Sequence, residues 1–280
     1  MSQEGGGGWR RLATLAASLF RIGPRDPTGK RLRRAEVRRY GEYTALQFVR
    51  GQTQSRMRTA DPDHLLIDYT RTMLGGLLWR PRPACIGIVG LGGGSQVKFC
   101  HRHLPETRIE VVENHPGVAA LRREFGIPDD DARLEVMLDD GARFLQARPG
   151  RYDLLLVDGY DETGIPEALS TQAFYDACHA ALAPRGVMAC NLYCADAGQH
   201  VARLLSAFGG RGRVCVVEEA MMSNRVAFAW IGEAPPCGPD AIVQVLATLP
   251  AAARVQLAPV FAQVATALRA HRSRRRPDSG

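Results

Sequence analysis

The chain has 280 residues, of which 45% are hydrophobic and 23% charged, enough for one large α/β domain and a small accessory domain. Its seven cysteines are scattered without a CxxC pair, so we expect free thiols in a reducing, cytoplasmic compartment and neither a disulfide framework nor a metal site. No apolar run approaches the about 20 residues that cross a bilayer, which argues against a membrane span.

The net charge of +7 is unevenly distributed along the chain. Residues 1–84 carry +9, residues 85–170 carry −6, and residues 171–280 carry +4. An enzyme that acts on nucleic acid is usually basic around its site, whereas the central segment here is acidic. We therefore expect a small cationic ligand and no specific nucleic-acid partner.

The first part of the chain predicts a flexible segment followed by a small β-domain. Residues 1–34 form the basic N-terminal segment, in which Trp9–Ile22 fits a basic amphipathic helix. Residues 35–80 predict a β-meander and a connecting helix over Asp63–Trp79, which Pro81 and Pro83 end. Glycines separate the three expected strands, which are Glu36–Arg39, Tyr43–Val49 and Gln52–Arg58.

Strands and helices alternate over residues 81–235, which predicts a doubly wound, mostly parallel α/β sheet. The expected strands are Ile86–Val89, Ile109–Glu113, Leu134–Leu138, Asp153–Val157, Gly186–Leu192, Val214–Glu218 and Arg225–Ile231. Helices are expected from Ser95 and over Gly117–Phe125, Ala142–Ala147, Thr171–Ala183 and Ala197–Phe208. The last two strands leave no room for a helix between them, so the final strand is expected to be antiparallel, as in Class I methyltransferase-like folds.

The end of the chain predicts helices and a tail. Residues 236–270 contain Ala/Leu/Val-rich sequence over Ala241–Ala270, typical of one or two helices that pack on the edge of the sheet. Residues 271–280, with the sequence HRSRRRPDSG, are expected to be a disordered, solvated basic tail.

A glycine-rich turn after the first parallel strand predicts a nucleoside site. The strand Ile86–Val89 leads into Gly90-Leu91-Gly92-Gly93-Gly94, and a helix follows. Glycines allow a tight turn and a close approach of backbone to ligand, and the helix start offers free N–H groups. Glu113, 23 residues after Gly90, ends the next strand and can accept hydrogen bonds from ribose hydroxyls.

Acidic residues follow three successive strands of the predicted sheet. Glu113 ends one strand, Asp139 and Asp140 follow the next, and Asp158 and Asp161 follow the third. Ligands bind at the carboxyl ends of parallel strands, so these acids are candidates for one site. Capping of the following helix explains one of Asp139 and Asp140 equally well.

Several of these segments resemble the spermidine synthase (polyamine aminopropyltransferase) family, in particular its spermidine-synthase-like bacterial branch. The resemblance runs from about Glu36 to Trp230. It is carried by GQTQSRM, VGLGGGS, VVENHP, LDDGARF and, most specifically, YDLLLVDGYDETGIPEALSTQAFYDACHAAL. It implies a small N-terminal β-domain, a methyltransferase-like Rossmann domain and a homodimer.

The resemblance also implies roles for individual residues. Asp158 is implied to lie beside the reacting amine, while Asp161 and Tyr69 hold the cationic acceptor. Glu113 is implied to hold the ribose, and Asp140 with the Gly141 backbone to contact the adenine. The residues implied to bind the donor are Gln54, Gly90, Gly92, Gly93, Glu113, Asp140 and Gly141.

The implied reaction transfers an aminopropyl group from decarboxylated S-adenosylmethionine to a diamine such as putrescine, without a metal. Two features leave alternatives open. Gly93 stands where the family has an aspartate that binds the amino end of the donor, and Arg71 places a positive charge where a polyamine would bind. An S-adenosylmethionine-dependent methyltransferase on the same fold and a non-catalytic nucleoside-binding protein are the other two hypotheses.

Overall fold

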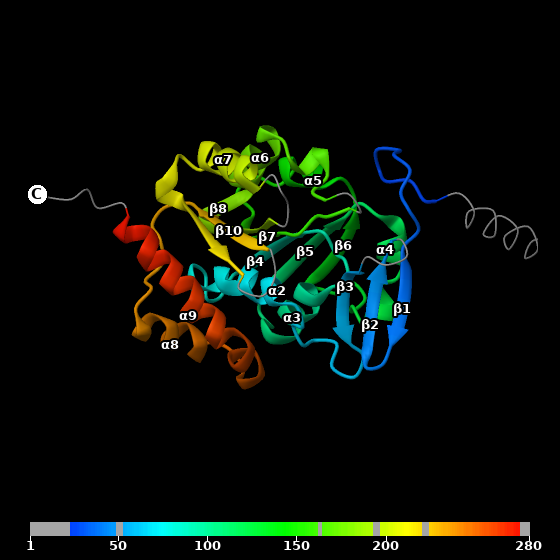
Figure 1. Cartoon of the computed structure of the whole chain (residues 1–280), viewed down its shortest axis with the longest axis horizontal. Helices are drawn as coiled ribbons and strands as arrows, with labels where there is room; N and C mark the ends of the chain where they lie inside the picture. The colour runs from blue at the N-terminus through cyan, green and yellow to red at the C-terminus, as the bar shows by residue number, and fades with distance from the viewer. Residues whose placement is uncertain (1–22, 49–52, 162–163, 193–196, 220–223, 275–280) are drawn as a thin grey trace, which may run out of the picture.

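The computed structural model describes residues 23–48, 53–161, 164–192, 197–219 and 224–274. A seven-stranded sheet forms the centre of the chain, and a three-stranded sheet lies at one side of it (Figure 1). The basic helix expected over Trp9–Ile22 lies outside the described residues.

The large sheet has the strand order β6-β5-β4-β7-β8-β10-β9. Strands β4 to β8 are parallel, and β10 is antiparallel to both of its neighbours. This confirms the doubly wound fold and the antiparallel final strand, which the sequence indicated by two strands without an intervening helix. The strands are β4 (Cys85–Val89), β5 (Arg108–Glu113), β6 (Leu134–Leu138), β7 (Tyr152–Val157), β8 (Leu182–Leu192), β9 (Val214–Glu218) and β10 (Arg225–Trp230).

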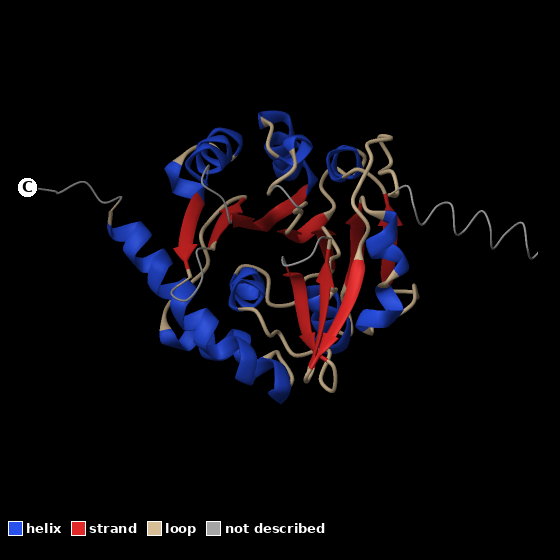
Figure 2. Cartoon of the chain, turned by 45° about the vertical axis from the view of Figure 1, so that its right-hand side comes forward, coloured by secondary structure: helices blue, strands red, loops and turns tan. Residues whose placement is uncertain are grey.

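Helices cover both faces of this sheet (Figure 2). Alternate residues of β4 serve the two sides, since Ile86 and Ile88 belong to one hydrophobic cluster and Cys85 and Val89 to the other. The helices α5 (Gly141–Gln146), α6 (Gln172–Ala181) and α7 (Ala197–Ala207) lie on one side, and α2 (Asp68–Met73) and α3 (Ser95–His103) lie on the other (Figure 1).

The small sheet is an antiparallel meander, as the sequence indicated. It consists of β1 (Glu36–Tyr40), β2 (Tyr43–Gln47) and β3 (Thr53–Arg58). The β2–β3 register is irregular, because Leu46 pairs with Ser55 while Gln47 pairs with Thr53, which leaves Gln54 at a bulge.

The prediction of a single helix over Asp63–Trp79 is wrong. The α-helix α2 begins only at Asp68, because the Leu65 N–H donates to the Gln256 side chain at 2.9 Å instead of entering a helical turn. After Met73 the chain continues as a 3-10 helix, η1 (Leu74–Leu78). There Gly76 packs closely on β7, since a Cβ at this position would lie 2.5 Å from Leu154 Cδ1.

Two further boundaries differ from the sequence prediction. The helix expected over Gly117–Phe125 is divided into α4 (Pro116–Ala120) and a 3-10 helix, η2 (Arg122–Phe125). Helix α6 ends at Ala181, and β8 begins at once with Leu182.

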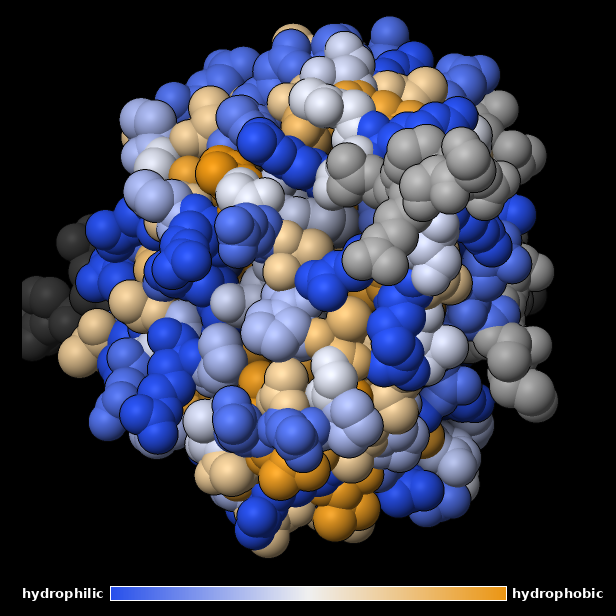
Figure 3. Space-filling model, turned by 90° about the vertical axis from the view of Figure 1, so that its left-hand side faces the viewer, coloured by the Kyte–Doolittle hydropathy of each residue, from blue (hydrophilic) through white to orange (hydrophobic). Residues whose placement is uncertain are grey.

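Two helices close the chain, α8 (Pro239–Ala247) and α9 (Ala251–Ser273). By length and composition α9 could cross a membrane, but its Leu257 and Phe261 side chains are fully buried and it packs against the edge strand β9. Hydrophilic side chains cover much of this end of the molecule (Figure 3). The tail expected to begin at residue 271 is wrong by three residues, because α9 continues through Ser273 and Arg272 donates to the Pro235 carbonyl at 2.6 Å.

Candidate active site

Asp158 lies directly after β7 and receives a hydrogen bond on each carboxylate oxygen. The Tyr69 hydroxyl, from α2, donates to Oδ2 at 3.1 Å, and the Asn191 amide, from β8, donates to Oδ1 at 2.8 Å. The backbone N–H of Asp158 donates to the Val89 carbonyl at 2.9 Å, which fixes the start of the loop. Three elements distant in sequence thus orient one carboxylate.

The surroundings of Asp158 alter its proton affinity. Burial raises the pKa of Asp158 above its ordinary value of 3.8, and the hydrogen bonds from Asn191 and Tyr69 partly oppose this rise. Burial and the Asp158 charge also hold the pKa of Tyr69 well above its ordinary value of 10.0. At neutral pH Tyr69 therefore remains a protonated donor, and Asp158 is a better proton acceptor than an exposed aspartate.

The glycine loop lies against the same strand end. Gly90 has φ +97°, and a Cβ there would lie 2.4 Å from the Asp158 carbonyl oxygen. Gly92 and Gly94 also have positive φ, at +50° and +67°, and α3 begins immediately after Gly94. The tight turn expected from the sequence is therefore present, and it brings the loop against the backbone of Asp158.

Glu113 ends β5 with its carboxylate directed at this loop. Its Oε2 accepts from the Leu91 N–H at 2.8 Å and its Oε1 from the His115 N–H at 2.7 Å. Burial raises the pKa of Glu113, and these two backbone donors partly oppose the rise. The Gly92 N–H is a third backbone donor near this carboxylate, and a carboxylate with about four acceptor positions keeps capacity for a ligand hydroxyl.

Asp139 and Asp140 have different local functions. Asp140 caps α5, since its Oδ1 accepts from the Ala142 and Arg143 N–H groups at 3.1 and 3.0 Å. Asp139 pairs with the Arg143 side chain, which lowers the pKa of Asp139. The capping alternative therefore holds for Asp140. The next residue, Gly141, lies close to β4, because a Cβ added to it would lie 2.9 Å from Val89 Cγ1.

Asp161, which is expected to hold the acceptor, and Arg71, which is expected to oppose it, both have charged neighbours. Asp161 Oδ2 lies 3.7 Å from the Lys30 ammonium, which comes from the N-terminal segment. Arg71 pairs with Asp68 one helical turn earlier, so its charge is balanced locally. The expectation that Arg71 opposes a cationic ligand is therefore weakened, because Arg71 is not a lone positive charge.

The small sheet reaches the glycine loop through Ser55. A Cβ added to Gly93 would lie 2.5 Å from Ser55 Oγ and 3.1 Å from Phe125 Cδ1. Gln54, the residue expected to reach the donor, is next to Ser55 at the bulge and is partly buried. Its role stays a prediction, whereas contact between β3 and the loop is present.

Comparison with known proteins agrees with this arrangement. Residues 69–207 match the spermine/spermidine synthase domain. A polyamine aminopropyltransferase of Chromobacterium violaceum is 35% identical over 188 residues, which cover 66% of this chain and 72% of that protein. This chain belongs to the spermidine synthase family.

Solved structures with low sequence identity show the same fold. A probable spermidine synthase from Corynebacterium glutamicum has a TM-score of 0.62 at 19% identity, covering 76% of this chain and 82% of that one. Human methyltransferase-like protein 13 has a TM-score of 0.57 at 23% identity, covering 70% of this chain and 92% of that one. The Class I methyltransferase-like fold is thereby confirmed.

Sequence reasoning missed Ser55, Lys30, Asn191 and Asn224. Asn191 follows the same strand-end rule that identified Asp158, so its position in β8 was an available signal. Asn224 directly precedes β10. Because β10 is antiparallel to β8, the start of β10 lies beside the carboxyl end of β8, where Asn191 lies. Ser55 and Lys30 have no such signal, because only the packing of the N-terminal segments brings them to the site.

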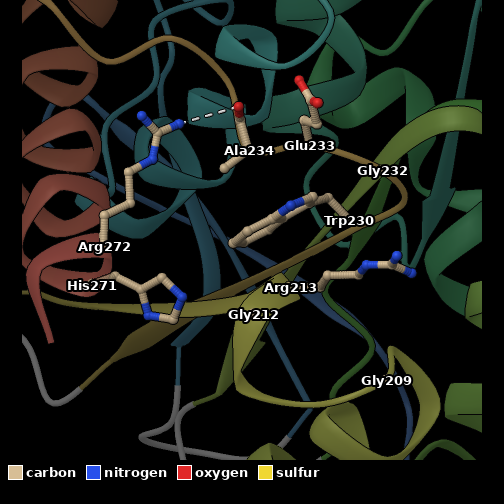
Figure 4. A pocket seen from close by; sticks show the side chains of 9 residues that line it. All are labelled: Gly209, Gly212, Arg213, Trp230, Gly232, Glu233, Ala234, His271 and Arg272. Atoms are coloured by element: carbon tan, nitrogen blue, oxygen red, sulfur yellow. Dashed lines mark hydrogen bonds between the residues drawn. The ribbon is translucent and has the colours of Figure 1, made fainter. Parts of the chain in front are cut away.

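A separate cavity of about 690 Å³ lies near the opposite end of the strands from Asp158 (Figure 4). Trp230 lines it, and Trp230 pairs with Val187, whereas the active-site end of β10 pairs with Leu192. The Arg272 side chain beside this cavity is hydrogen-bonded to the Ala234 carbonyl. None of the acids that the sequence indicated lines this cavity, so we do not assign the active site to it in spite of its size.

We expect Gly90→Ala to destabilise the protein more than Gly150→Ala. Both positions have positive φ, but a Cβ at Gly150 meets nothing within 4 Å. The backbone conformation costs about 1–2 kcal/mol in either variant, and the collision with Asp158 adds about 1–3 kcal/mol in Gly90→Ala. Denaturant unfolding measures both, and equal losses would show that the loop does not press on Asp158.

The pH dependence of stability tests the environment of Asp158. Because its folded pKa is raised, ionisation of Asp158 costs stability as pH rises through that pKa. The melting temperature of Asp158→Asn relative to the parent should therefore increase from acidic to neutral pH. Asp139→Asn is the control of opposite sign, because the lowered pKa of Asp139 stabilises the parent at neutral pH and this advantage disappears in acid. If the difference in melting temperature from the parent changed with pH in the same direction for both variants, the raised pKa assigned to Asp158 would be contradicted.

Proposed function

We propose that this chain transfers an aminopropyl group from decarboxylated S-adenosylmethionine to a diamine such as putrescine. The observation that carries the proposal is the Asp158 carboxylate, which Tyr69 and Asn191 hold, in a residue whose backbone carbonyl lies against the glycine loop. The relative from Chromobacterium violaceum, named polyamine aminopropyltransferase, supports the same reaction. The cytoplasmic location and the homodimer expected from the sequence are proposals of the same kind, and sedimentation of the purified protein tests the dimer.

The chemistry requires a base beside the acceptor nitrogen. An alkylamine has a pKa of about 10.4, so at neutral pH its lone pair is protonated. Once a proton has left the ammonium, the freed nitrogen lone pair attacks the aminopropyl methylene carbon bonded to the sulfonium, a C–N bond forms, and the C–S bond breaks with its electron pair moving to sulfur. Asp158 accepts the proton that leaves nitrogen, and its raised pKa favours this transfer. The product nucleoside is 5′-methylthioadenosine.

The remaining residues position the two substrates. Glu113 offers its open acceptor positions to the ribose hydroxyls, and the glycine loop allows the nucleoside to approach. We assign Asp161 to the distant ammonium of the diamine, which would replace the Lys30 ammonium that lies 3.7 Å from its Oδ2. Orienting reactants in this way contributes up to about 7–11 kcal/mol to such reactions.

Titration calorimetry with S-adenosylmethionine, its decarboxylated form and 5′-methylthioadenosine, followed by a putrescine turnover assay, tests the proposal. We expect preference for the decarboxylated donor and formation of a longer polyamine. Asp158→Asn should lower turnover at least about 100-fold, because the proton acceptor is lost, while 5′-methylthioadenosine affinity stays within about threefold. Preference for S-adenosylmethionine without a polyamine product would instead favour a methyltransferase.

The contact between Ser55 and Gly93 predicts how donor preference can be changed. An aspartate at position 93 would collide with Ser55, so Gly93→Asp alone should destabilise the loop and weaken donor binding. In Gly93→Asp/Ser55→Gly the closer collision is removed, and after a small shift of the Phe125 ring, 3.1 Å from the added Cβ, the new carboxylate can pair with the amino group of the decarboxylated donor. We expect this double variant to prefer that donor over S-adenosylmethionine at least about tenfold more than the parent does.

Calorimetry on the parent, both single variants and the double variant completes this cycle. Ser55→Gly alone is the matched control, because it opens the space without adding a charge. The explanation of Gly93 by Ser55 would fail if Gly93→Asp alone were as stable and as selective as the double variant.

A further inference from the structure

A chain of amide hydrogen bonds extends from Asp158 across three neighbouring strands. Asn191 donates its Nδ2 to Asp158 at 2.8 Å, and Asn224 donates its Nδ2 to the Asn191 Oδ1 at 2.8 Å. Asp158 follows β7, Asn191 lies in β8 and Asn224 precedes β10, which are adjacent in the sheet (Figure 1). Both asparagines are 4% exposed, so this is a buried network beneath the carboxylate.

The direction of the network is determined by Asp158. An ionised carboxylate only accepts hydrogen bonds, so Asn191 must turn its NH2 group toward Asp158 and its oxygen away. That oxygen in turn requires a donor, which is the NH2 group of Asn224. The Asn224 Oδ1 atom is then left buried without a hydrogen-bond donor in the part of the chain that the structure describes.

This arrangement is costly for a purely structural pair. A buried acceptor without a donor lowers stability, and an apolar side chain of similar size would avoid that cost. What the pair provides is donation toward Asp158. We propose that Asn191 and Asn224 are positioning residues that hold the Asp158 carboxylate in one orientation and favour its ionised form. The inference rests on the proposed function, in which Asp158 is the proton acceptor.

Other groups around Asp158 are consistent with this role. The Tyr69 phenol in α2 faces Asp158 directly, and the Tyr160 phenol after β7 lies near Tyr69. Tyr160 donates to the backbone carbonyl of Asn191 at 2.9 Å, which connects the loop to β8. The hydrogen bond from Asn191 lowers the pKa of Asp158 against the effect of burial. With Tyr69 on one oxygen and Asn191 on the other, the remaining acceptor positions face fixed directions.

The test compares Asn191→Leu and Asn224→Leu with the parent and with Cys190→Ala. Cys190 precedes Asn191 in β8 and belongs to the core cluster on the opposite face of the sheet. Its thiol donates to the Asn191 backbone carbonyl at 3.7 Å and not to the side-chain amide, so Cys190→Ala is a control for loss of stability that keeps both asparagine side chains. We expect Asn191→Leu to lower kcat about tenfold or more at neutral pH and to shift the acidic limb of the kcat profile to higher pH. Asn224→Leu should shift it in the same direction but less, because it acts through Asn191.

A merely structural role predicts a different result. Loss of stability without a shift of the pH profile in Asn191→Leu, or an equal shift in Cys190→Ala, would overturn the proposal. The donor KM should stay unchanged in both leucine variants, since the side-chain amides donate to Asp158 and to Asn191 and not to the glycine loop among the described residues.

A second readout separates this inference from the proposed function. If the parent transfers no aminopropyl group, the Asp158 titration is measured from the melting temperatures of the parent and Asp158→Asn across pH. The same comparison is then made between Asn191→Leu and Asn191→Leu/Asp158→Asn. There the titration of Asp158 should lie at higher pH, and this expectation does not depend on which reaction the protein catalyses. An unchanged titration would overturn the role of Asn191 even in an active enzyme, whereas a shifted titration in an inactive one would overturn only the proposed reaction.

Discussion

The contact between the glycine loop and the end of β7 is the constraint on which the site depends. Gly90 has a positive φ, and a side chain there would collide with the Asp158 carbonyl. The parallel pairing of β4 with β7 places these two strand ends together, and Gly90 allows them to approach closely. The glycine loop and the candidate proton acceptor are thereby held side by side.

The two buried carboxylates at this contact accept hydrogen bonds from different parts of the chain. The Glu113 carboxylate accepts from the backbone N–H groups of Leu91 in the glycine loop and of His115 after β5. The Asp158 carboxylate accepts from two neutral side chains, those of Tyr69 and Asn191. Neither carboxylate is neutralised by an adjacent cation in these contacts. Both therefore keep their negative charge available for a ligand that brings hydroxyls or a positive charge, at the cost of a raised pKa.

The sequence predicted the large sheet well because its signals are local. Apolar strands such as Ile86–Val89, a glycine turn and acids at strand ends can each be read within a few residues. It was less accurate for Asp63–Trp79, where helical spacing was present but tertiary contacts changed the outcome. The Leu65 N–H bonds to a side chain 191 residues away, and Gly76 packs against β7.

By itself the sequence determined the order of strands and helices, the glycine turn and the set of candidate acids, because these follow from periodicity and from residue chemistry. Only the tertiary structure decided which side chains meet. It placed Tyr69 and Asn191 on Asp158, Ser55 against Gly93, and Lys30 beside Asp161. These contacts join residues distant in sequence, and they depend on strand order and on the packing of the small sheet, which no local pattern encodes.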